Sequence, residues 1–198
     1  MKKVMLGLMI ILGVGAVQMN AQTVSIGMKA DISMTNFILT DIPDTESKLG
    51  IGASFGGFVK FDIGSNFAIQ PELLFLFQSS KMESSLLETN YEYWGMEIPV
   101  YAMCQWTNSS KGRFYAGVGP YVGLGFSAKY TDPEIKLYKD DVLQPLDFGF
   151  GAQIGYEFAN GIQINAGYKI GVVDALEAGK DNATMLPQRI SLGVGFRL

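Results

Sequence analysis

The sequence has little of what most catalytic and metal-binding sites are built from. Its 198 residues include no histidine and one cysteine, which excludes a catalytic or metal-binding histidine and a disulfide framework within the chain. Charged residues make up only 17% of the chain, too few for a disordered protein, and the formal net charge of −4 argues against a nucleic-acid partner. After the first twenty residues, no apolar run is long enough for a transmembrane helix.

The first residues have the layout of a secretory signal peptide. Two lysines precede an apolar stretch over 4–17, and Ala21 follows a short polar segment. A membrane anchor that stays attached needs about 20 apolar residues, and this stretch has fourteen. We therefore expect residues 1–21 to be a cleaved signal peptide and residues 22–198 to form one domain. The exact cleavage position stays open because Met19 is a poor residue at the third position before the cut.

The rest of the chain alternates with a period of two residues. From Val24 to Met34, apolar side chains occupy the even positions and small, polar or charged ones the odd positions, which predicts a strand with two unlike faces. The predicted strands cover 24–34, 50–63, 67–79, 91–106, 113–128, 147–158, 162–172 and 188–198. Most are near the ~9 to 11 residues that a tilted strand needs to cross a bilayer, or longer.

The connections between these strands alternate between long and short. The long ones cover 36–49, 80–90, 129–146 and 173–187, and the short ones cover 64–66, 107–112 and 159–161. This order predicts an up-and-down meander with both chain ends on one side. Asn160 and Gly161 predict a tight type I′ turn, because both central residues of such a turn need positive φ.

The two faces of the strands separate a membrane barrel from a soluble one. The apolar face carries no charge between its rims, whereas the other face carries six basic and six acidic residues and sixteen of the 24 glycines. A lipid-facing Lys or Arg at mid-bilayer costs about 2 to 4 kcal/mol, and a narrow lumen must pair its charges, since an unpaired buried charge is costly. The alternative is a soluble lipocalin-type barrel with the apolar face inside, whose solvent face has no reason to balance its charges.

The fold predicted from these faces is all-β, an eight-stranded antiparallel up-and-down transmembrane barrel. Its lumen is expected to hold a structural polar network of Lys29, Asp31, Lys60, Asp62, Glu72, Glu97, Arg113, Asp147, Glu157, Lys169, Arg189 and Arg197. Aromatic residues gather at both ends of the apolar face, as expected for rings at two membrane interfaces. They are Phe61, Phe67, Trp106, Phe114 and Phe158 beside the short turns, and Phe77, Trp94, Phe126 and Phe148 beside the long connections.

Three prolines lie inside predicted strands, where a closed barrel has no free edge. Pro71, Pro99 and Pro120 each remove a hydrogen-bond donor from the ladder. Because the apolar alternation continues across each proline, we expect a local distortion without a register shift. Apolar residues on the polar face are expected to pack inside the lumen: Phe58, Leu74 and Leu76.

Several segments resemble the PorT-like outer-membrane β-barrel proteins of Gram-negative bacteria, which are small barrels of the OmpA/OmpX kind. The resemblance is carried by residues 27–30, 69–74, 96–100, 117–123 and 147–151, which read GMKA, IQPELL, MEIPV, GVGPYVG and DFGFG. It implies an eight-stranded barrel in the outer membrane, reached by export across the inner membrane. One branch of the family is linked to protein secretion, and the family supplies no catalytic residues.

The interior offers little chemistry beyond pairing. Eight strands enclose a space that side chains just fill, so we expect no open pore; a proton or ion path through the charge pairs is the alternative. Lipid hydrolysis usually needs a histidine beside a serine, and none is present. Glu72 and Glu97 face inward on neighbouring strands, but arginine or lysine partners are the simpler role for them, and Cys104 is expected to be a small apolar filler on the lipid side. No catalytic residue, cofactor or metal is expected.

The long connections are the remaining place for binding, because loops on a rigid scaffold commonly carry it. Their acidic residues lack the spacing of a calcium loop and are expected to be solvated: Asp132, Glu134, Asp140, Asp141, Asp174, Glu177 and Asp181. We expect a monomer in outer-membrane lipid with a structural role or an interaction role through these connections. The alternative is an accessory component of a protein-secretion or envelope-assembly machine, with envelope or secretion proteins as partners.

Overall fold

The computed structural model describes residues 23–40, 45–47, 49–84, 87–108, 112–131, 134–136, 146–172 and 184–198. The predicted signal peptide and its cleavage position lie outside these residues. The strands are β1 (Thr23–Thr40), β2 (Thr45–Ser47), β3 (Gly50–Ile63), β4 (Phe67–Ser84), β5 (Leu87–Asn108), β6 (Gly112–Thr131), β7 (Glu134–Lys136), β8 (Leu146–Phe158), β9 (Ile162–Gly171) and β10 (Thr184–Arg197). In this part of the chain there is no helix with the length and apolar character to cross a membrane.

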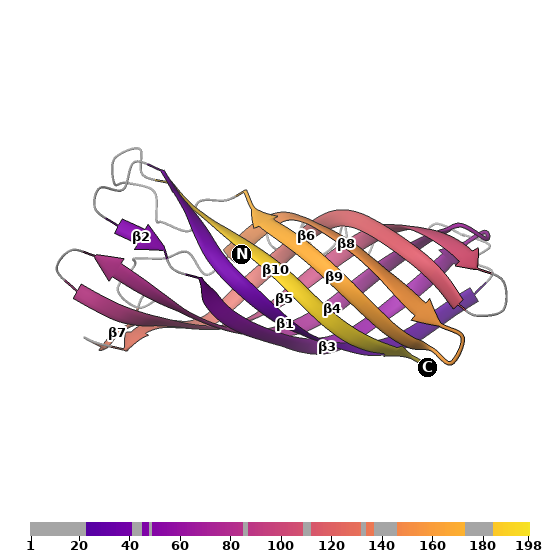
Figure 1. Ribbon diagram of the computed structural model, residues 1–198, viewed down its shortest axis with the longest axis horizontal. Helices are drawn as coiled ribbons and strands as arrows, with labels where there is room; N and C mark the ends of the chain where they lie inside the picture. The colour runs from indigo at the N-terminus through magenta and orange to yellow at the C-terminus, as the bar shows by residue number, and fades with distance from the viewer. Residues whose placement is uncertain are drawn as a thin grey trace, which may run out of the picture.

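The eight long strands close into an antiparallel barrel, which confirms the predicted fold class. Neighbours pair in the order β1, β3, β4, β5, β6, β8, β9 and β10, and β10 returns to pair with β1. The short strands β2 and β7 extend β4 and β6 at the end of the long connections, on the left in Figure 1. Thr23 pairs with Asp62 and Arg197 with Gly27, so both ends of the described barrel lie at the short turns, as predicted. Figure 1 shows the C-terminus at this end.

The strands run farther toward the long connections than the alternation of apolar residues indicated. The predicted long connection at 80–90 is wrong, because β4 continues to Ser84 and β5 begins at Leu87, directly opposite it. Likewise β1 continues to Thr40, which pairs with Thr184 of β10. Beyond the bilayer a strand pair no longer needs an apolar face, but its backbone ladder still forms, so the apolar pattern stops before the strand does.

The hairpin between β8 and β9 is tight, but its turn differs from the predicted one. The N–H of Gly161 donates to the carbonyl of Phe158 at 3.0 Å, which places Ala159 and Asn160 at the centre of the turn. Gly161 follows with φ of +86°. This is the pattern of a three-residue hairpin loop, in which a left-handed residue follows the turn, and not of a type I′ turn centred on Asn160 and Gly161.

The prolines interrupt pairing without changing the register, as predicted. Pairing skips Glu72 and Leu73 opposite Ile98 and Pro99, and resumes with the same alignment on either side. The seams between paired strands are interrupted in the same way at the other two prolines, between β3 and β4 at Pro71 and between β5 and β6 at Pro120. The one register shift in the described barrel ladders lies elsewhere, between Trp94 and Gly95 of β5.

The sidedness predicted from the sequence is confirmed. Phe55 and Ile154 each expose 63% of their surface on the outside of the barrel, whereas Lys60 and Glu157 expose 0% and 2%. Large aromatic side chains are exposed toward both ends of the outer face. The apolar residues expected inside the lumen are buried there: Phe58, Leu74 and Leu76.

Candidate functional site

The interior polar side chains are the candidate site, since the membrane-spanning part of the strands directs its charged side chains there. All twelve residues of the predicted network lie on the inward face of their strands and are buried or half-buried. They fall into three groups along the barrel. The short-turn cluster is Lys60, Asp62, Arg113, Glu157 and Arg197; the middle cluster is Lys29, Asp31 and Glu72; the long-connection cluster is Glu97, Asp147, Lys169 and Arg189.

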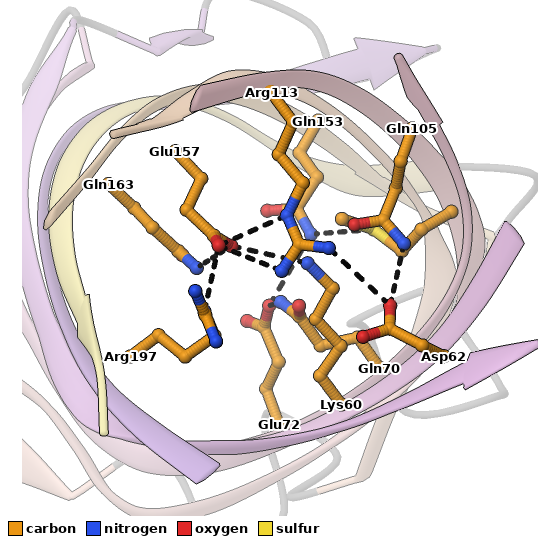
Figure 2. Close-up of polar contacts among 11 residues, drawn as sticks. Lys60, Asp62, Gln70, Glu72, Gln105, Arg113, Gln153, Glu157, Gln163 and Arg197 are labelled. Atoms are coloured by element: carbon orange, nitrogen blue, oxygen red, sulfur yellow. Dashed lines mark hydrogen bonds and ion pairs between the residues drawn. The ribbon is translucent and has the colours of Figure 1, made fainter. Parts of the chain in front are cut away.

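Glu157 of β8 is the centre of the short-turn cluster. Its Oε1 accepts from Arg113 Nε at 3.0 Å and Nη2 at 2.8 Å, and from Arg197 Nε at 2.7 Å. Its Oε2 accepts from Lys60 Nζ at 3.3 Å and Gln163 Nε2 at 2.9 Å. Figure 2 shows these groups converging from different walls of the barrel. One buried carboxylate therefore holds three cations, contributed by β3, β6 and β10.

Asp62 completes this cluster. Its Oδ1 accepts from Gln105 Nε2 at 2.7 Å and lies 3.8 Å from Arg113 Nη1 (Figure 2). The short-turn cluster thus contains three cations and two carboxylates.

The middle cluster has the opposite imbalance. Lys29 Nζ lies 3.2 Å from Glu72 Oε2 and 3.7 Å from Asp31 Oδ1. Glu72 Oε1 accepts from Gln70 Nε2 at 2.8 Å and Gln153 Nε2 at 3.4 Å. Two carboxylates share one ammonium, and two amides and the hydroxyl of Ser54 supply further donors.

In the long-connection cluster, Glu97 of β5 forms ion pairs with both Lys169 of β9 and Arg189 of β10. The hydroxyl of Tyr121 donates to Asp147 Oδ2 at 3.0 Å. Glu97 therefore joins β5 to two strands that are not its neighbours in the barrel. Glu157 joins β8 to β3 and β10 in the same way at the other end.

The residues considered for catalysis do not form an acid pair. Glu72 and Glu97 both face inward on adjacent strands, but Lys29 binds the first and two other cations bind the second. Cys104 lies on the outward face and is a free thiol. Among the side chains that the structure describes, no group of three Cys, Asp or Glu residues is arranged to hold a metal ion. The acidic residues of the long connections lie outside the described side chains.

Sequence reasoning selected formal charges and so missed the uncharged members of the interior. The glutamines 70, 105, 153 and 163 supply donors to the carboxylates. Tyr101, Met103 and Tyr115 pack with Ala68 in a buried cluster. Every one of them falls on the inward alternation of its strand, so the period-two pattern that located the charges could have found them too.

The closed barrel, its apolar exterior and its paired charged interior define the class of membrane-spanning β-barrels. A family model described as "Outer membrane protein beta-barrel domain" matches residues 20–177. The chain belongs to this family, and it is a protein of the outer membrane of the Gram-negative type. The narrower likeness to PorT-like proteins stays a prediction.

Solved structures agree on the fold. Neisserial surface protein A is 14% identical, with a TM-score of 0.54 over 89% of this chain and 99% of its own. The outer-membrane protein OprG from Pseudomonas aeruginosa is 11% identical, with a TM-score of 0.56 over 88% of this chain and 95% of its own. The outer-membrane enzyme PagL, at 12% identity, covers 84% of this chain and 98% of its own, but its TM-score of 0.46 carries no conclusion on activity. No curated protein sequence matches.

Proposed function

We propose that this protein is a monomeric, non-catalytic outer-membrane barrel whose interior network closes the lumen. The observation that supports closure is that charged pairs cross the lumen at three heights. Glu157 binds cations from three other strands, Glu72 of β4 binds Lys29 of β1, and Glu97 of β5 binds two cations from β9 and β10.

The energetics of buried ion pairs favour a plug over a channel. A hydrated ion that passed through would have to displace a paired charge at each height. Removing one partner from a buried pair costs about 3 to 5 kcal/mol. The pairs therefore act as a rigid brace, and we expect the lumen to be closed to solutes at rest.

Conductance in planar lipid bilayers tests the closed lumen. The purified wild-type protein should show no steady conductance. The double variant Arg113→Ala/Arg197→Ala removes two side chains that cross the lumen, and it should conduct more often than wild type. Val118→Ala, on the lipid face, should behave as wild type does. A stable channel of porin size in the wild-type protein would overturn the proposal.

Contacts with other proteins are assigned to the long connections, since the short turns offer little chain for binding. Affinity isolation from crosslinked outer membranes tests this role. Recovery of the barrel alone supports a structural protein, whereas a stoichiometric complex with secretion proteins supports the accessory role in a secretion machine. Lipid mass spectrometry of a deletion strain checks the non-catalytic assignment. If the protein were a lipid-modifying enzyme, its deletion would leave the lipid substrate unmodified.

A further inference from the structure

The short-turn cluster carries an excess positive charge in an acidic protein. It contains three cations against two carboxylates, while the whole chain has a net charge of −4. The described residues around this end of the barrel add no acidic side chain: they are 23, 64–66, 107–108, 112, 159–161 and 198. The described side chains of this rim therefore do not neutralise the excess.

The positive groups of this cluster are also its accessible part. The side chains of Arg113 and Arg197 expose 20% and 30% of their surface, whereas the side chain of Glu157 beneath them exposes 2%. A solute at the short-turn mouth meets guanidinium groups before it reaches the carboxylate. Figure 2 shows both guanidinium groups directed toward the carboxylate of Glu157 inside the lumen.

Arg197 has hydrogen-bond donors left over. It uses Nε to bind Glu157 at 2.7 Å, and among the described residues its Nη1 and Nη2 have no hydrogen-bond partner. Arg113 binds the same oxygen of Glu157 at 2.8 Å, so two like charges crowd around one oxygen. A second oxygen anion on the open side would accept the free donors and reduce this repulsion, since the guanidinium fork fits carboxylate and phosphate groups.

We propose that the short-turn mouth is a binding site for an oxyanion, a carboxylate or phosphate group, held between Arg113 and Arg197. Short turns of outer-membrane barrels face the periplasm, so the group would be presented from that side. The site lies at the opposite end from the long connections and does not depend on the closed lumen.

Nitrogen-15 NMR of the arginine side chains in non-ionic detergent micelles tests this site. Inorganic phosphate and acetate are titrated separately at constant ionic strength. The Nε signals of Arg113 and Arg197 should shift and saturate, while that of Arg189, at the other end of the barrel, should not move. Saturation by phosphate at lower concentration would identify a phosphate group as the natural ligand, and saturation by acetate at lower concentration a carboxylate.

Two substitutions with opposite expected effects on anion affinity separate binding from a loss of folding. Arg197→Gln should weaken the tighter-binding anion by about tenfold or more. Asp62→Asn removes a competing carboxylate and should tighten it severalfold, a gain that misfolding cannot produce. Arg189→Gln is the matched control and should leave the affinity unchanged. Each variant is first shown to be folded by the heat-dependent shift of its gel mobility. The absence of a saturable shift in the wild type, wild-type affinity in Arg197→Gln, or an equal loss in Arg189→Gln would overturn the proposal.

Discussion

Gly27 of β1 lies directly opposite Phe58 of β3, and the phenyl ring occupies the space where a side chain at position 27 would stand. Phe58 is one of the large apolar side chains on the inward face, 3% exposed. The barrel thus accommodates a ring in its lumen by leaving out a side chain on the neighbouring strand. Gly155 makes room for the ring of Tyr115 in the same way.

The first prediction concerns this packing. Gly27→Ala should destabilise the barrel by about 1 to 3 kcal/mol, the usual cost of overpacking a filled core, because a methyl group there overlaps Phe58 and the carbonyl of Phe196. Gly57→Ala is the control, since its methyl group would meet only the carbonyl of Gly27, at 3.3 Å. Urea unfolding of protein refolded in detergent measures both. Equal unfolding midpoints for the two variants would contradict this account.

The fold could be predicted from the sequence because a barrel wall repeats one simple rule. Lipid on one side and a narrow lumen on the other impose the same alternation on every strand, so residues such as Phe55 and Lys60 reveal their sides without reference to any partner. The pattern weakens where that constraint ends. Past the bilayer, β4 and β5 continue as a backbone ladder that no apolar alternation marks.

The pairing within the lumen could not be predicted in the same way. Alternation places Glu157 and Lys60 inside, but their strands are far apart in sequence, and the contact depends on the closure and stagger of the barrel. The equal number of basic and acidic residues in the network also conceals the unequal charge of its individual clusters. Twelve charges that sum to zero could form six isolated pairs, yet Glu157 collects three cations while Lys29 is shared by two carboxylates.

The second prediction concerns the centre of the short-turn cluster. Glu157→Gln keeps the shape of the side chain but leaves three cations without their common counter-charge. The loss in unfolding free energy should be about 3 to 5 kcal/mol. Gln163→Leu, which removes one uncharged donor from the same carboxylate, should cost about 1 kcal/mol. Urea titration of both variants in lipid vesicles measures the difference, and similar losses would show that charge is not what stabilises this end.

The third prediction tests which surface touches lipid. Val118 lies near the middle of β6 and exposes 63% of its surface on the outer face. Val118→Arg should lower the stability of the refolded protein in vesicles by about 2 to 4 kcal/mol, the cost of a lipid-facing charge at mid-bilayer. Ala159→Arg, in the exposed β8–β9 turn, should cost about 0 to 1 kcal/mol, because the charge stays near the interface. If Val118→Arg is tolerated as well as Ala159→Arg, this face does not lie in the hydrocarbon.

The fourth prediction concerns the prolines of β4, β5 and β6. Pro71, Pro99 and Pro120 interrupt pairing at three adjacent seams, whereas the ladder between β1 and β10 is continuous. A seam that lacks a donor opens more readily, and local opening sets the exchange rate of the amides beside it. The amide of Val100, which faces Pro120 in the gap between β5 and β6, should therefore exchange faster than that of Ala30 in β1, by about tenfold, which corresponds to about 1.4 kcal/mol.

Hydrogen exchange followed by NMR in detergent micelles measures these rates. Pro120→Val supplies the missing donor opposite Val100, at a position whose side chain is exposed on the outer face. It should slow exchange at Val100 and leave Ala30 unchanged, since Ala30 belongs to the uninterrupted seam. Equal rates at the two amides in the wild type would mean that neighbouring contacts compensate for the interrupted ladder. In that case the three seams would be as rigid as the rest of the wall, and the prolines would affect only its local shape.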